Sequence, residues 1–253
     1  MTALALEHVD KRFPTGTLAL QGVSLSVGSG EFVSLLGPSG CGKSTVLRLL
    51  AGLDQPSAGR VRHPERAAET GFVFQSPTLM PWARVADNVS LPLRLAKQPR
   101  AQIDAAVQSA LERVGLAEFA QAFPRELSGG MQMRVAIARA LVTRASLLLL
   151  DEPFAALDEI GRMRLNVELL RLWQQERFTA VFVTHSVMEA VFLSQRVVVM
   201  APRPGRVAQE IRIDAPYPRD ESWRASAAFA ASCVQVSQAL QRAVESAEEA
   251  AHA

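Results

Sequence analysis

Short apolar runs with the patterning of β-strands recur along the chain, and helical patterns separate several of them. Two-residue alternation or continuous apolar character predicts strands at 3–7, 24–27, 32–36, 71–74, 147–150, 180–184 and 196–200. Apolar positions spaced by three and four residues predict helices at 43–51, 131–142 and 159–175. Strands that alternate with helices favour an α/β fold with a largely parallel sheet.

The segment 77–145 interrupts this alternation. It contains no convincing strand, and it begins as a loop punctuated by prolines that leads into helical patterns. An apolar stripe with steps of four, four and three residues is formed by Ile103, Val107, Leu111 and Val114. We therefore expect this segment to be a helical subdomain inserted into an α/β core.

The whole chain, 1–253, is expected to form one domain with three parts. The α/β core comprises 1–76 and 146–215, and the inserted helical subdomain is 77–145. The remainder, 216–253, is rich in alanine and is expected to be a docked helical tail. Its apolar residues recur at steps of four, three, four and four, at Phe229, Cys233, Val236, Leu240 and Val244.

Composition excludes several classes of protein. With 253 residues, 49% hydrophobic and 21% charged, the chain is neither disordered nor collagenous, and its two cysteines cannot form a disulfide framework. A net charge of +2 without a basic block gives no support for nucleic-acid binding. No apolar run reaches the 18 or so residues of a membrane helix, and the N-terminus lacks a signal-peptide pattern. We expect a cytosolic chain that would work at a membrane only as a bound subunit.

A glycine-rich loop follows the predicted strand 32–36 and leads into the helix at 43–51. Its residues match GxxxxGK[ST] and are Gly37, Pro38, Ser39, Gly40, Cys41, Gly42, Lys43, Ser44 and Thr45. Glycines let successive N–H groups point into one concavity, and the helix N-terminus adds a positive dipole, so the loop predicts a phosphate site. Lys43 would reach the β and γ phosphates of ATP, and the Ser44 hydroxyl would hold Mg²⁺. Only three of the 27 basic residues are lysines, so the pattern is rarely met by chance.

Two carboxylates, Asp151 and Glu152, end the apolar run 147–150. Four consecutive apolar residues suit a strand covered on both faces, and ligands gather at the carboxyl ends of such strands. Asp151 is therefore a candidate to support Mg²⁺, and Glu152 is a candidate to activate the attacking water. Taken alone, the same pattern could be an ordinary strand end.

The sequence around Ser128 gives the chain its resemblance to a family. Leu-Ser-Gly-Gly-Met at 127–131 matches the signature of the nucleotide-binding subunits of ATP-binding cassette (ABC) transporters. Ser128 is also a predicted helix N-cap, and Gly129 and Gly130 leave the backbone free, so a second anion site is expected there. A capped surface helix is the alternative for this segment in isolation. The resemblance implies a P-loop NTPase core with a helical insert and a small antiparallel β subdomain, and a head-to-tail homodimer in which each signature closes over the partner's ATP.

Four further residues fall at positions used by that family. By resemblance, Gln75 contacts Mg²⁺ and the attacking water, Asp158 communicates across the dimer, and His185 contacts the γ phosphate. Phe13 matches the aromatic residue that stacks on adenine, where tyrosine is more frequent. Each also has an ordinary alternative, a hydrogen-bonding residue at a strand end or, for Phe13, a core residue. Cys41 is interpreted as a small filler without chemistry, and the remaining histidines as surface residues.

Three segments resemble the branch that powers nitrate, sulfonate and taurine importers, with pyrimidine-precursor importers close by: 76–82, 85–89 and 202–206. Pro81 and Trp82 would lie near the groove that receives a permease helix, or would pack against the helical insert. Two features depart from the family pattern. Met133 stands where glutamine is usual, and 59–70 is short for the antiparallel sheet.

The resemblance implies partners and a location. They are a second copy of the chain, two integral-membrane permease subunits and, indirectly, a solute-binding protein that selects the cargo, with no nucleic acid. The chain would lie peripherally on the cytoplasmic face of the inner membrane and hydrolyse ATP with Mg²⁺. An exporter's ATPase subunit and a soluble ABC-type ATPase that remodels a macromolecule remain the alternative functions.

Overall fold

The computed structural model describes residues 2–62 and 70–252, and the chain divides into two compact units. The first unit contains 1–67 and 177–253, and the second contains 68–176. The two units are groups of residues that contact one another more than they contact the rest of the chain. The predicted parts instead separate strand-rich from helix-rich segments of the sequence. The predicted boundaries at 76, 145 and 215 therefore stay a prediction.

An antiparallel sheet of three strands lies in the first unit, in the order β2-β1-β4. The strands are β1 (Thr2–Arg12), β2 (Leu18–Gly28) and β4 (Ala58–Arg62). β2 alternates along part of its length, with Val23, Leu25 and Val27 buried and their neighbours exposed, because one face of the sheet packs inward. The sequence patterns missed β4, which is mostly exposed and carries no apolar alternation. The segment 59–70, expected to be short for the antiparallel sheet, contains most of β4 and the first residue of β5, and 63–69 lies outside the described residues.

The first unit also contains strands β7-β3-β8-β9, neighbours in that order. β3 (Phe32–Leu36), β7 (Thr179–Thr184) and β8 (Arg196–Ala201) are parallel, and β9 (Arg206–Arg212) is antiparallel to β8. Every residue of β3 and β7 is buried, as continuous apolar runs predict for strands covered on both faces. The helices of this unit are α1 (Lys43–Leu50), α6 (Val187–Leu193), α7 (Glu221–Arg224) and α8 (Ala227–His252).

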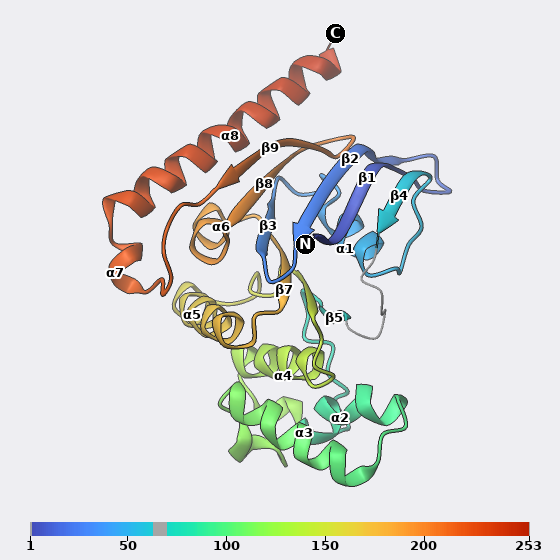
Figure 1. The fold of residues 1–253 in the computed structure, drawn as a ribbon, viewed down its shortest axis with the longest axis vertical. Coiled ribbons are helices and arrows are strands. Elements are labelled where there is room, and N and C mark those ends of the chain that lie inside the picture. The colour runs from blue at the N-terminus through green and yellow to red at the C-terminus, as the bar shows by residue number, and fades with distance from the viewer. Residues whose placement is uncertain (1, 63–69, 253) are drawn as a thin grey trace. The chain divides into compact units, whose positions relative to one another are not determined.

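The predicted terminal helix is present as α8, which runs beside β8 and α6 (Figure 1). Phe229 and Val236 of the predicted stripe are buried, and Ala239 and Ala243 are buried with them. The Trp223 ring of α7 packs edge-on against Phe229, with ring centroids 4.9 Å apart. Small alanines let the helix approach the sheet closely, which explains why the buried stripe is broader than the large apolar residues indicate.

The second unit pairs two parallel strands with helices. β5 (Thr70–Val73) lies beside β6 (Leu147–Asp151), and the helices are α2 (Val85–Leu95), α3 (Arg100–Arg113), α4 (Gly129–Leu141) and α5 (Glu159–Glu176). Short 3-10 helices span Ala117–Phe119 and Pro124–Glu126. Helices α2, α3 and α4 pack together (Figure 1). The predicted stripe of α3 faces the core that they share, with Ile103, Val107 and Leu111 buried and Val114 partly buried.

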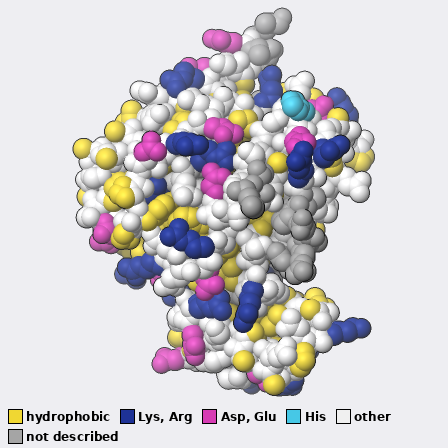
Figure 2. All heavy atoms as spheres, viewed as in Figure 1, with side chains coloured by type: hydrophobic (Ala, Val, Ile, Leu, Met, Phe, Trp, Pro, Cys, Tyr) yellow, Lys and Arg dark blue, Asp and Glu magenta, His cyan; other side chains and the backbone are white. Residues whose placement is uncertain are grey.

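Charges on the surface are mixed in sign. On the face drawn in Figure 2, Lys and Arg side chains are interspersed with Asp and Glu. This mixture matches the small net charge of +2. Among the described residues, none of the helices combines the length and apolar character needed to span a membrane.

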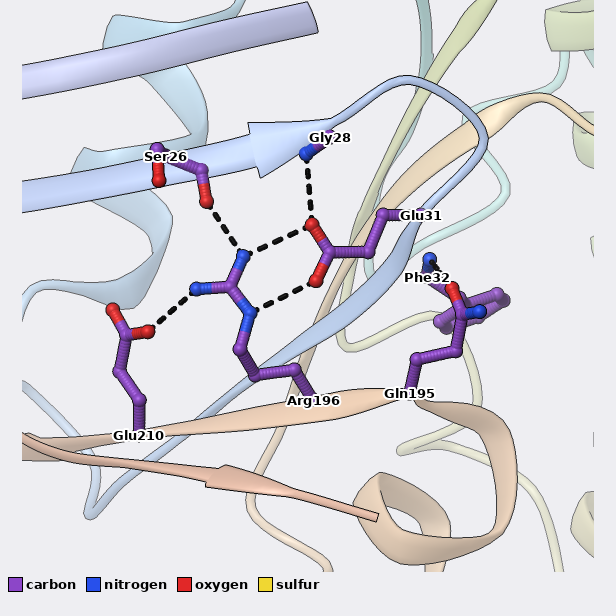
Figure 3. Close-up of polar contacts among 7 residues, drawn as sticks. All are labelled: Ser26, Gly28, Glu31, Phe32, Gln195, Arg196 and Glu210. Carbon is purple, nitrogen blue, oxygen red and sulfur yellow. Dashed lines mark hydrogen bonds and ion pairs between the residues drawn. The ribbon is translucent and has the colours of Figure 1, made fainter. Parts of the chain in front are cut away.

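Arg196, at the start of β8, ties four segments of the first unit together (Figure 3). Its guanidinium donates a bidentate pair of hydrogen bonds to Glu31, at 2.9 and 3.0 Å, and further bonds of 2.6 Å to Glu210 and to the Ser26 carbonyl. Burial alone disfavours the charged guanidinium, but the hydrogen bonds and charges of Glu31 and Glu210 outweigh it and raise the pKa of Arg196. The fork geometry is what arginine supplies and lysine does not.

We expect Arg196→Lys to lower the free energy of unfolding by about 1–2 kcal/mol, because a point charge cannot satisfy both Glu31 oxygens and the Ser26 carbonyl. Chemical unfolding followed by circular dichroism measures the loss. The matched control is Arg212→Lys, at the exposed β9 position opposite Arg196, which should change stability by less than about 0.5 kcal/mol. Equal losses in the two variants would contradict this account.

Candidate nucleotide site

The glycine-rich loop of the first unit has the backbone that a phosphate nest requires. It joins the end of β3 at Leu36 to the start of α1 at Lys43. Gly40 and Gly42 have φ values of 76° and 92°, a left-handed region that residues with a Cβ rarely adopt. Gly42 is the N-cap of α1, so the first N–H groups of that helix face the loop.

Neighbouring atoms leave no space for a side chain at two glycines of the loop. A Cβ on Gly37 would lie 2.7 Å from Cys41 Sγ and 2.9 Å from the Met200 carbonyl oxygen. A Cβ on Gly42 would lie 2.5 Å from a Leu20 methyl carbon. Cys41 itself is fully buried, in agreement with its interpretation as a filler. Side chains are thus excluded at Gly37 and Gly42, which holds the backbone of the loop in its curl.

Lys43 is buried within this curl, with 4% of its surface exposed. Its ammonium group donates hydrogen bonds to the carbonyls of Gly37 at 2.8 Å and Pro38 at 3.1 Å. A buried lysine needs such acceptors, and the same donors can turn to anionic oxygens. Ser44, the next residue, is exposed at the first turn of α1. The backbone nest, the Lys43 ammonium group and the Ser44 hydroxyl together suit the phosphate chain of a nucleotide and its magnesium ion.

His185 leaves the sheet at the same edge as the loop. β3 and β7 are parallel, with Leu36 opposite Thr184, and His185 follows directly with an exposed side chain. The turn is braced by Glu189, whose carboxylate accepts a short hydrogen bond from the Thr184 hydroxyl. Thr184 in turn accepts from the Ser186 amide at 2.9 Å. Glu189 was not predicted, although an acidic residue three positions after a serine is a sequence signal for a helix start.

Phe13 is half-buried at the end of β1, and the Lys11 ammonium lies 5.3 Å from its ring centroid. The Phe13 side chain is therefore neither buried in the core nor fully exposed. Its role beside adenine stays a prediction.

In the second unit, Gln75 and the two carboxylates leave one edge of the β5–β6 pair. Val73 lies opposite Leu150 in the parallel register, so Gln75 and Asp151 lie at the adjacent ends of two neighbouring strands. Glu152 has φ of 45°, a left-handed conformation that is strained for a residue with a Cβ. Both carboxylates are half-buried, and Gln75 is exposed. Strain of this kind turns consecutive side chains in different directions, as a metal ligand and a water-activating base require.

The signature segment forms a capped helix, as predicted. Ser128 is the N-cap of α4, and its hydroxyl accepts a hydrogen bond from the Met131 amide at 3.3 Å. Ser128 and Gly129 are exposed, so this helix N-terminus is open to a ligand. Met133, the departure from the family pattern, is 3% exposed and belongs to the packed side of α4. It therefore does not alter the surface that the signature presents.

Asp158 caps α5. Its carboxylate accepts a hydrogen bond from the Gly161 amide at 2.8 Å. This contact gives Asp158 a structural role, and its communication across a dimer stays a prediction.

Two residues that the sequence analysis passed over brace the loop after Gln75. Arg139 of α4 donates hydrogen bonds to the carbonyls of Pro77 and Thr78, at 2.8 and 2.9 Å, and burial lowers its pKa. Asn88 of α2 is fully buried and bonds both backbone groups of Met80. The loop that follows Gln75 is thus tied to the signature helix.

Trp82, in the same loop, is 77% exposed. Of the two interpretations, packing against the helical insert is therefore wrong, and a partner surface remains.

The predicted site residues fall into two sets, one in each unit. The first unit carries Phe13, His185 and the loop Gly37, Pro38, Ser39, Gly40, Cys41, Gly42, Lys43, Ser44 and Thr45. The second unit carries Gln75, Ser128, Gly129, Gly130, Asp151, Glu152 and Asp158.

Comparison with known proteins identifies the family. The family model described as ABC transporter matches residues 20–155. The aliphatic sulfonates import ATP-binding protein SsuB 1 of Pseudomonas savastanoi pv. phaseolicola is 48% identical over 213 residues, covering 84% of this chain and 87% of that protein. The chain therefore belongs to the ATP-binding subunits of ABC transporters.

Solved structures agree with this assignment. The structure of cbiO1 from Clostridium perfringens, described as part of the ABC transporter complex cbiONQ, has a TM-score of 0.77 and 30% identity, covering 84% of this chain and 89% of that one. The ATP-binding cassette MJ0796, dimeric and bound to ADP and Pi in a post-hydrolysis state, has a TM-score of 0.74 and 32% identity, covering 84% and 100%. The fold is that of an ABC ATPase, and the chain is an ATP-hydrolysing enzyme of that family, with ATP as nucleotide and Mg²⁺ as its metal ion.

We expect Gly42→Ala to weaken ATP binding by roughly tenfold or more, because the added Cβ displaces either Leu20 or the loop. Titration with a fluorescent ATP analogue measures the affinity. Gly16→Ala is the matched control: its φ of 88° imposes the same backbone strain, but its Cβ would meet nothing within 4 Å. If the two variants bound ATP equally, the crowding at Gly42 would have no part in forming the nest.

Proposed function

We infer that this chain is the ATPase subunit of an ABC importer for a small solute of the nitrate, sulfonate or taurine kind. The observation that carries the proposal is the pairing of a complete phosphate loop with an open, capped signature helix in a chain 48% identical to a sulfonate import ATP-binding protein. The importer resemblance in 76–82, 85–89 and 202–206 points the same way.

In this proposal the loop holds the triphosphate through its backbone N–H groups and Lys43. Ser44, Asp151 and Gln75 offer a hydroxyl, a carboxylate and an amide oxygen, which are the hard donors that Mg²⁺ prefers. When bound, Mg²⁺ neutralises charge on the phosphate oxygens.

Hydrolysis is assigned to Glu152 and His185. Glu152 orients or deprotonates the attacking water from its strained position, and Gln75 contacts the same water. His185 donates to the γ phosphate from the turn that Glu189 braces. Positioning and charge stabilisation supply most of the acceleration in phosphoryl transfer, so these roles need fixed geometry more than strong acids or bases.

The signature helix completes the site of a second copy. Ser128, Gly129 and Gly130 lie at the positive end of α4, a 13-residue helix, with Ser128 and Gly129 exposed and Gly130 partly buried. Head-to-tail pairing would place this end against the partner's triphosphate, with Asp158 next to the interface. The dimeric MJ0796 cassette supports this arrangement. ATP binding closes the dimer, and hydrolysis releases it.

Coupling to transport runs through the loop after Gln75. Arg139 and Asn88 make this loop continuous with α4 and α2, so a shift at Gln75 reaches the helical insert. Pro81 and Trp82 form the exposed apolar end of the loop, where a permease helix would dock. Two permease subunits and a solute-binding protein complete the importer, which places this chain on the cytoplasmic face of the inner membrane.

We expect Glu152→Gln to retain ATP binding and to lose turnover by roughly 100-fold or more, since the amide cannot accept the proton from water. Phosphate release measures turnover, and size-exclusion chromatography with ATP and Mg²⁺ detects a trapped dimer. Glu159→Gln, an exposed carboxylate at the start of α5, is the control and should hydrolyse ATP normally. Near-normal turnover in Glu152→Gln would reject Glu152 as the base, and a monomer under these conditions would reject the closed dimer.

We expect Trp82→Ala to lose its permease partners on purification from the native membrane while keeping the basal ATPase rate. Removal of a large exposed aromatic from an interface typically costs 2 kcal/mol or more, about 30-fold in affinity. The control is Leu95→Ala, at 73% exposure on the far end of α2. Mass spectrometry of the partners tests the wider proposal: a permease with a solute-binding protein supports import, whereas an exporter's membrane subunits or ribosomal or DNA partners would overturn it.

A further inference from the structure

The turn between β8 and β9, residues 202–205, lies against the phosphate loop. A Cβ on Gly37 would lie 2.9 Å from the Met200 carbonyl oxygen, and a Cβ on Gly205 would lie 2.2 Å from the Cys41 carbonyl oxygen. The end of β8 and the last residue of the turn therefore both lie close to the loop. The Gly205 amide also donates to the Ala19 carbonyl at 2.9 Å, which fixes the turn to the start of β2.

Arg203 stands in the middle of this turn, beside the middle of the loop. Its Nη2 atom lies 3.7 Å from the point that a Cβ on Gly40 would occupy. Standard backbone geometry then places the guanidinium within about 6 Å of the Gly40 amide nitrogen. That amide belongs to the nest whose N–H groups bind phosphate, so the cation lies at the rim of the site.

Two properties of Arg203 separate it from an ordinary surface arginine. Its φ of 28° lies in the left-handed region, which costs free energy for a side chain with a Cβ and is maintained here by the contacts of the turn. Its side chain is exposed, and within the described part of the chain no carboxylate pairs with it. The positive charge is thus held next to the nest without a compensating anion.

We propose that Arg203 is a further nucleotide-binding residue, which contacts an oxygen of the triphosphate bound in the loop. The proposal rests on the nucleotide site described above and adds a second cation to it. Lys43 is the buried cation of the loop, and Arg203 is an exposed cation beside Gly40. Because the guanidinium is a fork of donors, it suits phosphate oxygens in particular.

The expected effect is moderate because Arg203 is exposed. If the distance of about 6 Å to the Gly40 amide is taken as the separation of the two charges, their attraction in water changes an affinity about threefold, and partial exclusion of water increases this to tenfold or more. We therefore expect Arg203→Gln to weaken ATP binding by about three- to tenfold and ADP binding by less. Arg203→Lys should keep most of the ATP affinity.

Titration of the full-length chain with a fluorescent ATP analogue, with ATP and ADP as competitors, tests the proposal. Arg206→Gln is the matched control, since it removes the same charge three residues away on β9 and should leave both affinities within about twofold of the wild type. Arg203→Gly serves as a second variant, because glycine tolerates the positive φ and keeps the turn intact. The difference between wild type and Arg203→Gln should shrink at high salt, where exposed charges are screened.

Unchanged ATP affinity in both Arg203→Gln and Arg203→Gly would overturn the proposal, as would equal losses in Arg203→Gln and Arg206→Gln. Lys43→Ala distinguishes this failure from failure of the nucleotide site itself. If Lys43→Ala lost ATP binding while the Arg203 variants kept it, the loop would be the nucleotide site without a contribution from Arg203. If Lys43→Ala also bound ATP normally, the site would be misplaced altogether.

Discussion

The parallel register of the buried strands is the constraint on which the predicted site residues of each unit depend. In the first unit it sets Leu36 opposite Thr184, so the phosphate loop and His185 leave β3 and β7 at one edge. In the second it sets Val73 opposite Leu150, so Gln75 and the two carboxylates leave β5 and β6 together. A slip of one residue would move every side chain of a strand to the opposite face and disrupt the packing on both faces, which makes these strand ends reproducible.

Just beyond the ends of these strands, the backbone adopts conformations that most residues avoid. Gly40 and Gly42 curl the phosphate loop, whereas Glu152 adopts a positive φ despite its Cβ. A glycine is used where the backbone itself must contact the ligand, and strain is tolerated where a side chain must be aimed. Arg203 shows the second case again, on the turn that lies against the loop. Tight packing around each turn supplies the free energy that holds these conformations.

Sequence patterns predicted the elements wherever one physical signal dominated. Continuous apolar runs predicted β3, β6 and β7, and the spacing of apolar residues predicted α3 and α8. The patterns missed β4 because an exposed strand at a sheet edge needs no apolar alternation. They could not recognise Arg139 and Asn88 as braces, because both act through backbone carbonyls of a loop that has no pattern of its own.

The sequence by itself determined the class of chemistry: a glycine-rich loop with one lysine, an apolar run ending in two carboxylates, and a serine-headed helix belong to an ABC ATPase wherever they occur. These signals are local, since each depends on residue types within ten positions of one another. Only the tertiary structure decided that Trp82 is exposed, that Met133 is packed away, and that Arg203 lies beside Gly40. Such facts depend on contacts between segments far apart in the chain, and no local pattern of side chains encodes them.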